Sequence, residues 1–113
     1  MKLEGEQTLM RIFVGESDRW QRKPLYDAIV EMLKSEGFAG ATVLKGVMGF
    51  GAGSVVHSDR LLRLSSDLPV VIEVVESEEM IENVLDRLDE MVSGGMITLE
   101  KARVIRYRPE EKK

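Results

Sequence analysis

The feature that most constrains the fold of this chain is a strand–helix–strand order that occurs twice within 113 residues. Apolar and β-prone segments predict four strands: Thr8–Val14, Ala41–Met48, Leu68–Val75 and Ile97–Tyr107. One amphipathic helix lies between the two strands of each half. Two such units interleave as an α+β, ferredoxin-like βαββαβ sandwich, in which a four-stranded antiparallel sheet carries two helices on one face.

The two helices are indicated by apolar spacing and by signals at their ends. Pro24 suits the first position of the first helix, and apolar residues recur at helical spacing from there to Gly37. In the second half Ser77 is suited to cap a helix, which Gly94 and Gly95 end. Each helix therefore has one face that must be buried against the sheet.

The position of each strand in the sheet follows from its composition. Thr8–Val14 and Leu68–Val75 are the most apolar strands and are expected in the centre. The other two carry basic side chains, as exposed edges require. Because no helix covers the second face of the sheet, we expect oligomerisation to bury it.

Length and composition restrict the classes of protein that fit. A chain of 113 residues suits a single domain over 1–113, with a core spanning about 8–108. Without cysteine, disulfides, thiolate nucleophiles and cysteine metal ligands are excluded. No apolar run is long enough for a signal or membrane segment, so we expect a cytoplasmic protein without membrane insertion. The net charge of −4 argues against nucleic acid as a partner.

A glycine-rich segment, Lys45–His57, contains four of the ten glycines and the single histidine. It fails the P-loop pattern because Ala52 stands where that pattern needs lysine, and it fails the dinucleotide pattern because Ser54 replaces the third glycine. A structural turn and a ligand loop both remain open. The connection 51–67 that follows is long enough to predict a functional loop.

A catalytic role is poorly supported. The residues that most resemble a triad lie close together in sequence: Ser54, His57, Ser58 and Asp59. Neighbours one or two apart on an extended chain do not converge on one point, and a metal site needs three or four converging ligands. We expect no catalytic residues, no metal and no enzyme activity, and we expect His57 to make a hydrogen bond within the loop.

Two arginines near the end of the last predicted strand are candidates for phosphate binding. Arg106 and Arg108 are two apart, so they project to the same side if the strand continues that far. Guanidinium groups match phosphate oxygens, and backbone N–H groups of a glycine loop add further donors. The alternative, that these are solvent-facing arginines of an edge strand, stays open.

At this point two segments resemble a known family. Val47-Met-Gly49-Phe50-Gly51 before the long loop, and Ala102–Glu110 with its arginines at the end, are similar to the corresponding segments of PII signal-transduction proteins. More closely, the segment from Gly46 to His57 followed by Leu68-Pro-Val-Val-Ile-Glu resembles an uncharacterised PII-like family of unknown function. The resemblance covers roughly residues 8–108.

The resemblance implies a ferredoxin-like homotrimer whose clefts between subunits bind an adenine nucleotide such as ATP, ADP or AMP, with no cofactor required. The residues it places at a cleft are Gly49, Phe50 and Gly51 from one side, and Gly94, Gly95, Arg106 and Arg108 from another. Loop 51–67 would project from the body and signal to an unknown partner protein. Ala52 and Gly53 replace the arginine and glutamine that follow Gly-Phe-Gly in PII proteins.

We therefore predict a PII-like regulatory protein that binds an adenine nucleotide, or a related small metabolite, and changes its loop for a partner. The alternative is a protein-interaction module that uses the loop without any small ligand. A small hydrolase using His57 is the third hypothesis.

Overall fold

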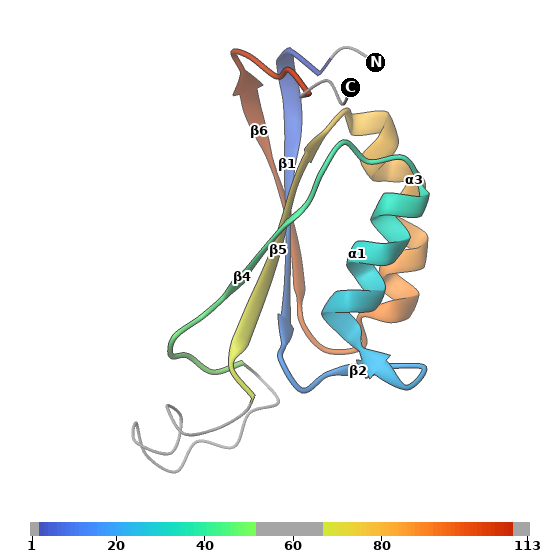
Figure 1. Cartoon of the computed structure of the whole chain (residues 1–113), viewed down its shortest axis with the longest axis vertical. Helices are drawn as coiled ribbons and strands as arrows, with labels where there is room; N and C mark the ends of the chain where they lie inside the picture. Colours follow the sequence, from blue (N-terminus) through green and yellow to red (C-terminus); the bar gives the residue numbers. More distant parts are fainter. Residues whose placement is uncertain (1–2, 52–66, 110–113) are drawn as a thin grey trace.

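The computed structural model describes residues 3–51 and 67–109. Figure 1 shows its elements, which in chain order are β1 (Gly5–Gly15), β2 (Arg19–Trp20), β3 (Lys23–Pro24), α1 (Leu25–Ser35), β4 (Thr42–Lys45), β5 (Pro69–Glu76), α3 (Glu78–Met91) and β6 (Met96–Val104). The predicted βαββαβ order is confirmed. Between β1 and α1 the chain adds the short β2–β3 hairpin, which sequence periodicity did not predict.

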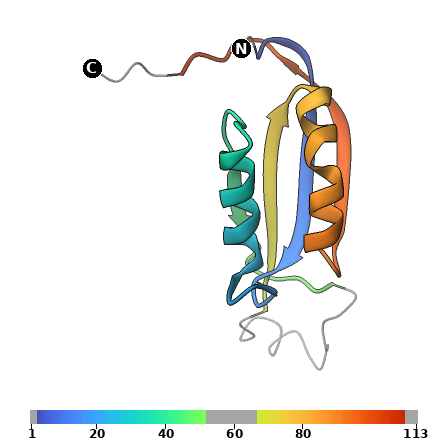
Figure 2. The ribbon, with the colours of Figure 1, turned by 90° about the vertical axis from the view of Figure 1, so that its right-hand side faces the viewer.

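The four long strands form one antiparallel sheet in the order β4-β5-β1-β6. The first strand of each half is central, as predicted. Both helices lie against the same face of this sheet (Figures 1 and 2). The α+β sandwich expected from the sequence is therefore the fold of the described residues.

The core lies between the helices and the central strands. Every second residue of β5 is buried, and the same alternation holds along β1 from Met10 to Val14. The helices add a row of fully buried side chains, which includes Ile29, Leu33, Ile81 and Leu88. Period-two strands and period-3.6 helices thus contribute their apolar faces to a single cluster.

The first residues of α1 and α3 lie within one residue of their predicted positions. The Ser77 hydroxyl accepts the Met80 N–H at 3.2 Å, which confirms Ser77 as the cap of α3. Pro24 precedes α1 as its N-cap instead of occupying the first helical position. Pro24 is held by its pairing with Arg19 in the hairpin, so the helix begins at Leu25.

Two strands end earlier than predicted, and their partners explain why. β4 ends at Lys45 because its partner strand, β5, begins at Pro69. At this point Gly46 donates its N–H to the Pro69 carbonyl at 2.7 Å. β6 ends at Val104, which pairs with Gly5, the first residue of β1. Because the sheet offers no further partner there, the prediction that the last strand extends to Tyr107 was wrong.

The second face of the sheet carries an ion-pair triad at its centre. Arg11 Nε donates to Glu73 Oε2 on β5 at 2.8 Å, and its guanidinium also bonds the carboxylate of Glu100 on β6. These interactions, led by the hydrogen bond to Glu73, raise the pKa of Arg11. Half-buried Leu9 and Phe13 flank the triad on β1. No helix of the described chain covers this face (Figure 2).

One carboxylate is buried within the fold. Glu76, at the end of β5, is fully buried and accepts the N–H groups of Ala39 at 2.8 Å and of Ser77 at 3.3 Å. A buried carboxylate is tolerated only where hydrogen bonds replace water. Glu76 therefore fastens the segment after α1 to the start of α3.

Replacing Glu76 by alanine should lower the free energy of unfolding by about 2 kcal/mol, because two N–H groups lose a charged acceptor that is itself buried. Urea unfolding at one fixed protein concentration measures the change. Glu82→Ala is the matched control, since Glu82 is exposed and makes no salt bridge with any described residue. Equal losses for both variants would contradict this role of Glu76.

Candidate ligand-binding segments

The glycine-rich segment begins against β5. At Gly49 the backbone has φ of +157°, and a Cβ atom there would lie 2.8 Å from Cγ of Pro69. Only glycine combines that conformation with so close an approach. The segment that leads into residues 52–66 is thus held close to the first residue of β5.

The turn between α3 and β6 makes a similar approach to β1. Gly95 has φ of +154°, and a Cβ atom at this position would collide with the Phe13 carbonyl oxygen. Gly94 beside it is exposed, with open space where a side chain would project. A side chain at position 95 would force the turn away from the sheet.

The two glycine segments lie at the same end of the sheet. Pro69, which Gly49 touches, pairs with Gly15, and Phe13, which Gly95 touches, lies two residues earlier on the same strand. Figure 1 shows the segment after β4 and the turn before β6 together at the lower end. The structure therefore groups Gly94 and Gly95 with Gly49.

Arg106 and Arg108 lie at the opposite end. β6 runs from Met96, which pairs with Phe13, to Val104, which pairs with Gly5. The eight steps from one residue to the next, at about 3.3 Å each, put roughly 26 Å between the ends of this strand. The arginines follow the upper end of β6 in Figure 1. Both are exposed, and neither forms a salt bridge with another described residue. A single chain does not bring them to its glycine segments.

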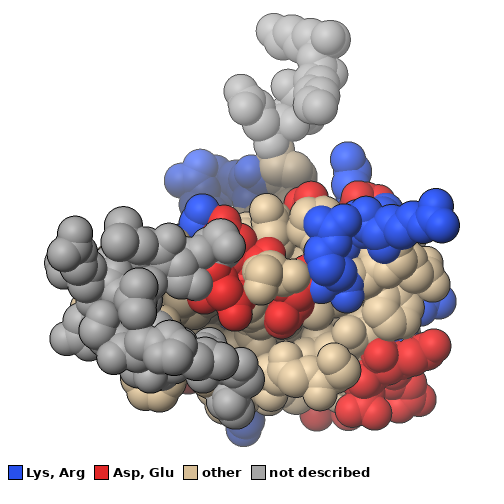
Figure 3. Space-filling model, turned by 90° about the horizontal axis from the view of Figure 1, so that it is seen from below, with Lys and Arg blue, Asp and Glu red and all other residues tan. Residues whose placement is uncertain are grey.

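Several carboxylates lie at the glycine end. Asp18 accepts the Gly15 N–H at 2.9 Å, and Asp67 accepts the Ser17 N–H at 3.3 Å. Lys45 forms an ion pair with Glu16, which raises the pKa of the lysine through a hydrogen bond and through charge. In Figure 3, which shows this end, Asp and Glu side chains gather near the centre of the view.

Lys45 was not among the predicted site residues. Its signal in the sequence is its position directly before Gly46, where a cation would stand beside a glycine loop. Its ammonium is engaged by Glu16 in an ion pair.

Apolar side chains at the start of the loop project into solvent. Val47 is 89% exposed and Phe50 is 68% exposed, and Met48 between them is also exposed. Phe50 was predicted at the cleft with Gly49 and Gly51, and all three precede the undescribed segment directly. Large apolar groups presented this way are suited to contact a ligand or another protein.

Several sequence hypotheses fall outside the described residues. Ser54, His57, Ser58 and Asp59 lie there, as does loop 51–67 apart from its first and last residues. Over residues 3–51 and 67–109 no three His, Asp or Glu side chains are placed to hold a metal ion. Among the helices that the structure describes, none has the length and apolar character needed to cross a membrane.

Comparison with known proteins places the chain among PII-like folds. A CPII structure from Thiomonas intermedia K12, a nitrogen regulatory PII-like protein bound to ADP, AMP and bicarbonate, superposes with a TM-score of 0.67 at 16% identity, over 89% of this chain and 90% of that one. A candidate PII-like signaling protein from Thermus thermophilus gives 0.62 at 20% identity, over 89% and 91%. At these identities the likeness establishes the fold.

Relatives identified by sequence share more identity with this chain than these solved structures do. A UPF0166 protein of Aquifex aeolicus (strain VF5) is 36% identical over 100 residues, covering 88% of this chain and 94% of the relative. A UPF0166 protein of Methanocaldococcus jannaschii is 39% identical over 97 residues, covering 85% and 89%. Residues 7–104 match the family DUF190, described as "Uncharacterized ACR, COG1993". The chain is thus a member of the DUF190 family, and its fold is that of the PII-like proteins.

Proposed function

We propose that this chain is a PII-like regulatory protein that binds an adenine nucleotide between the subunits of a homotrimer and signals to a partner protein through loop 51–67. The CPII structures bound to ADP and AMP, which share the fold, support the choice of ligand. The role we assign is regulatory and not catalytic.

The observation that carries this proposal is the separation of charge along the sheet. The glycine end allows close backbone approach, but among the described residues the side chains that bond there are the carboxylates of Asp18 and Asp67 and a lysine paired with Glu16. Arg106 and Arg108 are exposed at the other end. A phosphate bound beside Gly49 and Gly51 calls for cations, and the exposed Arg106 and Arg108 of the same chain follow the far end of β6, a strand about 26 Å long. A second copy supplies them, so each site is shared between two chains.

The uncovered sheet face supports assembly of copies. Leu44 and Met96 are exposed on its two edge strands, and half-buried apolar side chains lie between them on β1 and β5. An apolar face with an ion-pair triad at its centre favours burial against further protein more than contact with water. We assign this face to the trimer interior, which leaves both helices on the outside.

The roles we assign follow from position. Gly49 and Gly51 let the backbone approach the nucleotide, Phe50 offers an exposed aromatic face to the base, and Gly94 and Gly95 shape the same end of the sheet. Arg106 and Arg108 of the neighbouring copy bind phosphate. Ligand contacts made in only one arrangement of the loop would shift the population toward that arrangement.

A second candidate function is a protein-interaction module without a small ligand. The exposed side chains of Val47, Met48 and Phe50 favour it, because they present an apolar strip at the base of the loop. Under this alternative the arginines at the other end have no part in the interaction.

Nucleotide binding is tested by thermal shift and calorimetry with ATP, ADP and AMP at millimolar concentration. A ligand present at 100 times its Kd stabilises the folded state by about 2.7 kcal/mol, which raises Tm by several degrees. The double variant Arg106→Ala, Arg108→Ala should lose at least about tenfold in affinity through two charged hydrogen bonds. Arg103→Ala, which removes an exposed arginine from β6, is the matched control. Absence of a shift with all three nucleotides would contradict the proposed ligand.

If two chains share each site, two variants that are defective on opposite sides of the site should restore binding when they assemble together. Gly51→Glu adds a carboxylate at a position where a Cβ atom would meet no described atom within 4 Å, so it should repel phosphate without disturbing the fold. When Gly51→Glu is co-expressed with the double arginine variant, binding should return at about a quarter of the sites. Random assembly of closed oligomers places an intact glycine side beside an intact arginine side at about that fraction of the sites. Light scattering should give three times the chain mass of 12.7 kDa. A mixture that binds no better than either variant alone would refute a shared site.

A further inference from the structure

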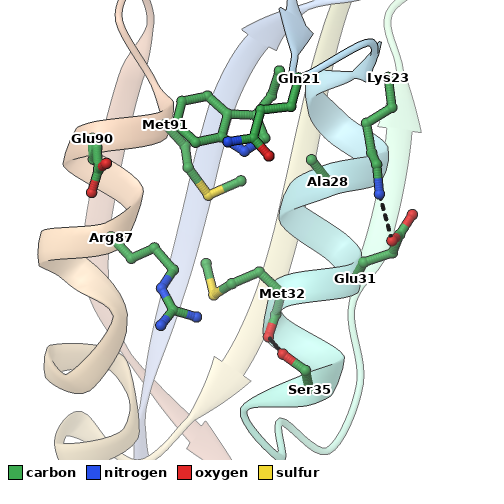
Figure 4. Close-up of a pocket in the computed structure, with 10 residues that line it drawn as sticks. Gln21, Lys23, Ala28, Glu31, Met32, Ser35, Arg87, Glu90 and Met91 are labelled. Carbon is green, nitrogen blue, oxygen red and sulfur yellow. Dashed lines mark hydrogen bonds and ion pairs between the residues drawn. The ribbon is translucent and has the colours of Figure 1, made fainter.

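A groove runs between α1 and α3 on the outer side of the helix layer. Its volume is about 480 Å³, and Gln21 of the β2–β3 hairpin stands at one end (Figure 4). The residues that line it are Trp20, Gln21, Lys23, Ala28, Glu31, Met32, Ser35, Arg87, Glu90 and Met91. None of these residues belongs to the glycine segments or to the arginine pair.

The floor of the groove is apolar and adaptable. Ala28, Met32 and Met91 are buried, and the two methionine side chains point into the same space between the helices in Figure 4. Half-buried Trp20 packs on the core beside them. Unbranched methionine side chains and an indole wall together suit a large apolar side chain of variable shape.

The hairpin is held in a strained conformation. Gln21 and Arg22 at its tip have φ of +47° and +73°, which non-glycine residues seldom adopt and which costs of order 1 kcal/mol each. Arg19 Nη2 donates to the Arg22 carbonyl at 2.6 Å, which closes the turn. The hairpin pairs only with itself, so its structural effect is to fix Trp20 at the groove.

The two helices that flank the groove are strongly acidic. Together with the residue that caps the end of α1, they carry nine carboxylates and two cations: Asp27, Glu31, Glu36, Glu78, Glu79, Glu82, Asp86, Asp89 and Glu90 against Lys34 and Arg87. Like charges recur at i, i+4 along α3 from Glu78 to Glu90, a spacing that destabilises a helix. Among the described residues no carboxylate of α3 forms a salt bridge. This surface is therefore complementary to a basic partner.

We propose that the α1–α3 groove docks a basic amphipathic helix of a partner protein. A large apolar side chain of the partner enters between Trp20, Met32 and Met91. Its flanking lysines or arginines face Glu90, the outer carboxylates of α3, and Glu31, which pairs with Lys23 at 2.9 Å in the free chain. This is the helix-in-groove mode of recognition, in which anchors at i, i+3 and i+4 enter an apolar cleft.

The groove is separate in position from the nucleotide site that we propose. The helices cover one face of the sheet, and the face we assign to the trimer interior is the other one (Figure 2). Assembly of copies through that second face leaves the groove at the outer surface. Docking here consequently requires neither Arg106 nor Arg108.

The chain's single tryptophan lies in the groove, so its fluorescence reports occupancy directly. The probe is an 18-residue peptide of leucine and lysine with a helical period of 3.6 and no aromatic residue. We expect a saturable blue shift of Trp20 emission and reduced quenching by acrylamide. A shuffled peptide of the same composition and a leucine–glutamate peptide of the same pattern should bind at least about tenfold more weakly, because apolar anchors and charge must coincide.

Charge reversal locates the binding site. The double variant Glu31→Lys, Glu90→Lys changes two exposed groove residues and should raise Kd at least about tenfold. The matched control Glu4→Lys, Glu6→Lys alters exposed carboxylates near the start of β1 and should change Kd less than about threefold, since neither residue lines the groove and salt screens distant charges. Circular dichroism confirms that each variant folds.

The Arg106→Ala, Arg108→Ala variant should bind the peptide with unchanged affinity, which separates this proposal from that for the nucleotide. Three results would each overturn the groove as a docking site. They are binding of the shuffled peptide as tight as that of the patterned one, an unchanged Kd for Glu31→Lys, Glu90→Lys, and Trp20 emission that does not respond to the peptide.

Discussion

The structure depends on the burial of one face of the central strand pair, β1 and β5, beneath two helices. Their alternate residues, from Met10 to Val14 and from Val70 to Val74, meet the apolar faces of α1 and α3 in one cluster. Because strand side chains alternate, the same pairing places Arg11 and Glu73 side by side on the other face. The fold thus creates a second surface that two helices cannot cover, and the charged triad gives that surface a defined polar centre.

Antiparallel pairing also decides where chemistry can take place. The end of β4 and the start of β6 lie at one end of the sheet, and the end of β6 lies at the other. Backbone suited to approach an anion is therefore separated within one chain from the arginines best suited to bind it. In the assembly that we propose, association of copies through the uncovered face would remove this separation, so that assembly and ligand binding would depend on the same one-sided sheet.

The sequence predicted the strand interiors and both helices because burial imposes a period on each. It did not predict the strand ends, since these depend on partners: Val104 is last in β6 because Gly5 is first in β1. The β2–β3 hairpin was missed because two-residue strands show no period and its tip, Gln21-Arg22, lacks the glycine or asparagine typical of such turns. The glycine segment was located by its residues, whereas its distance from Arg106 followed only from strand register.

The two proposed surfaces meet at the end of α3. Met91 lines the groove and is the last residue of this helix, and Gly94 and Gly95 follow within one turn at the glycine end of the sheet. Contact between Gly95 and Phe13 leaves that turn little freedom to adjust without moving either α3 or β1. If a nucleotide and a docked helix favour different positions of the turn, each lowers the affinity of the protein for the other by the same factor. If both favour the same position, each raises the affinity for the other by the same factor. In this proposal the short α3–β6 connection carries the coupling between the two sites.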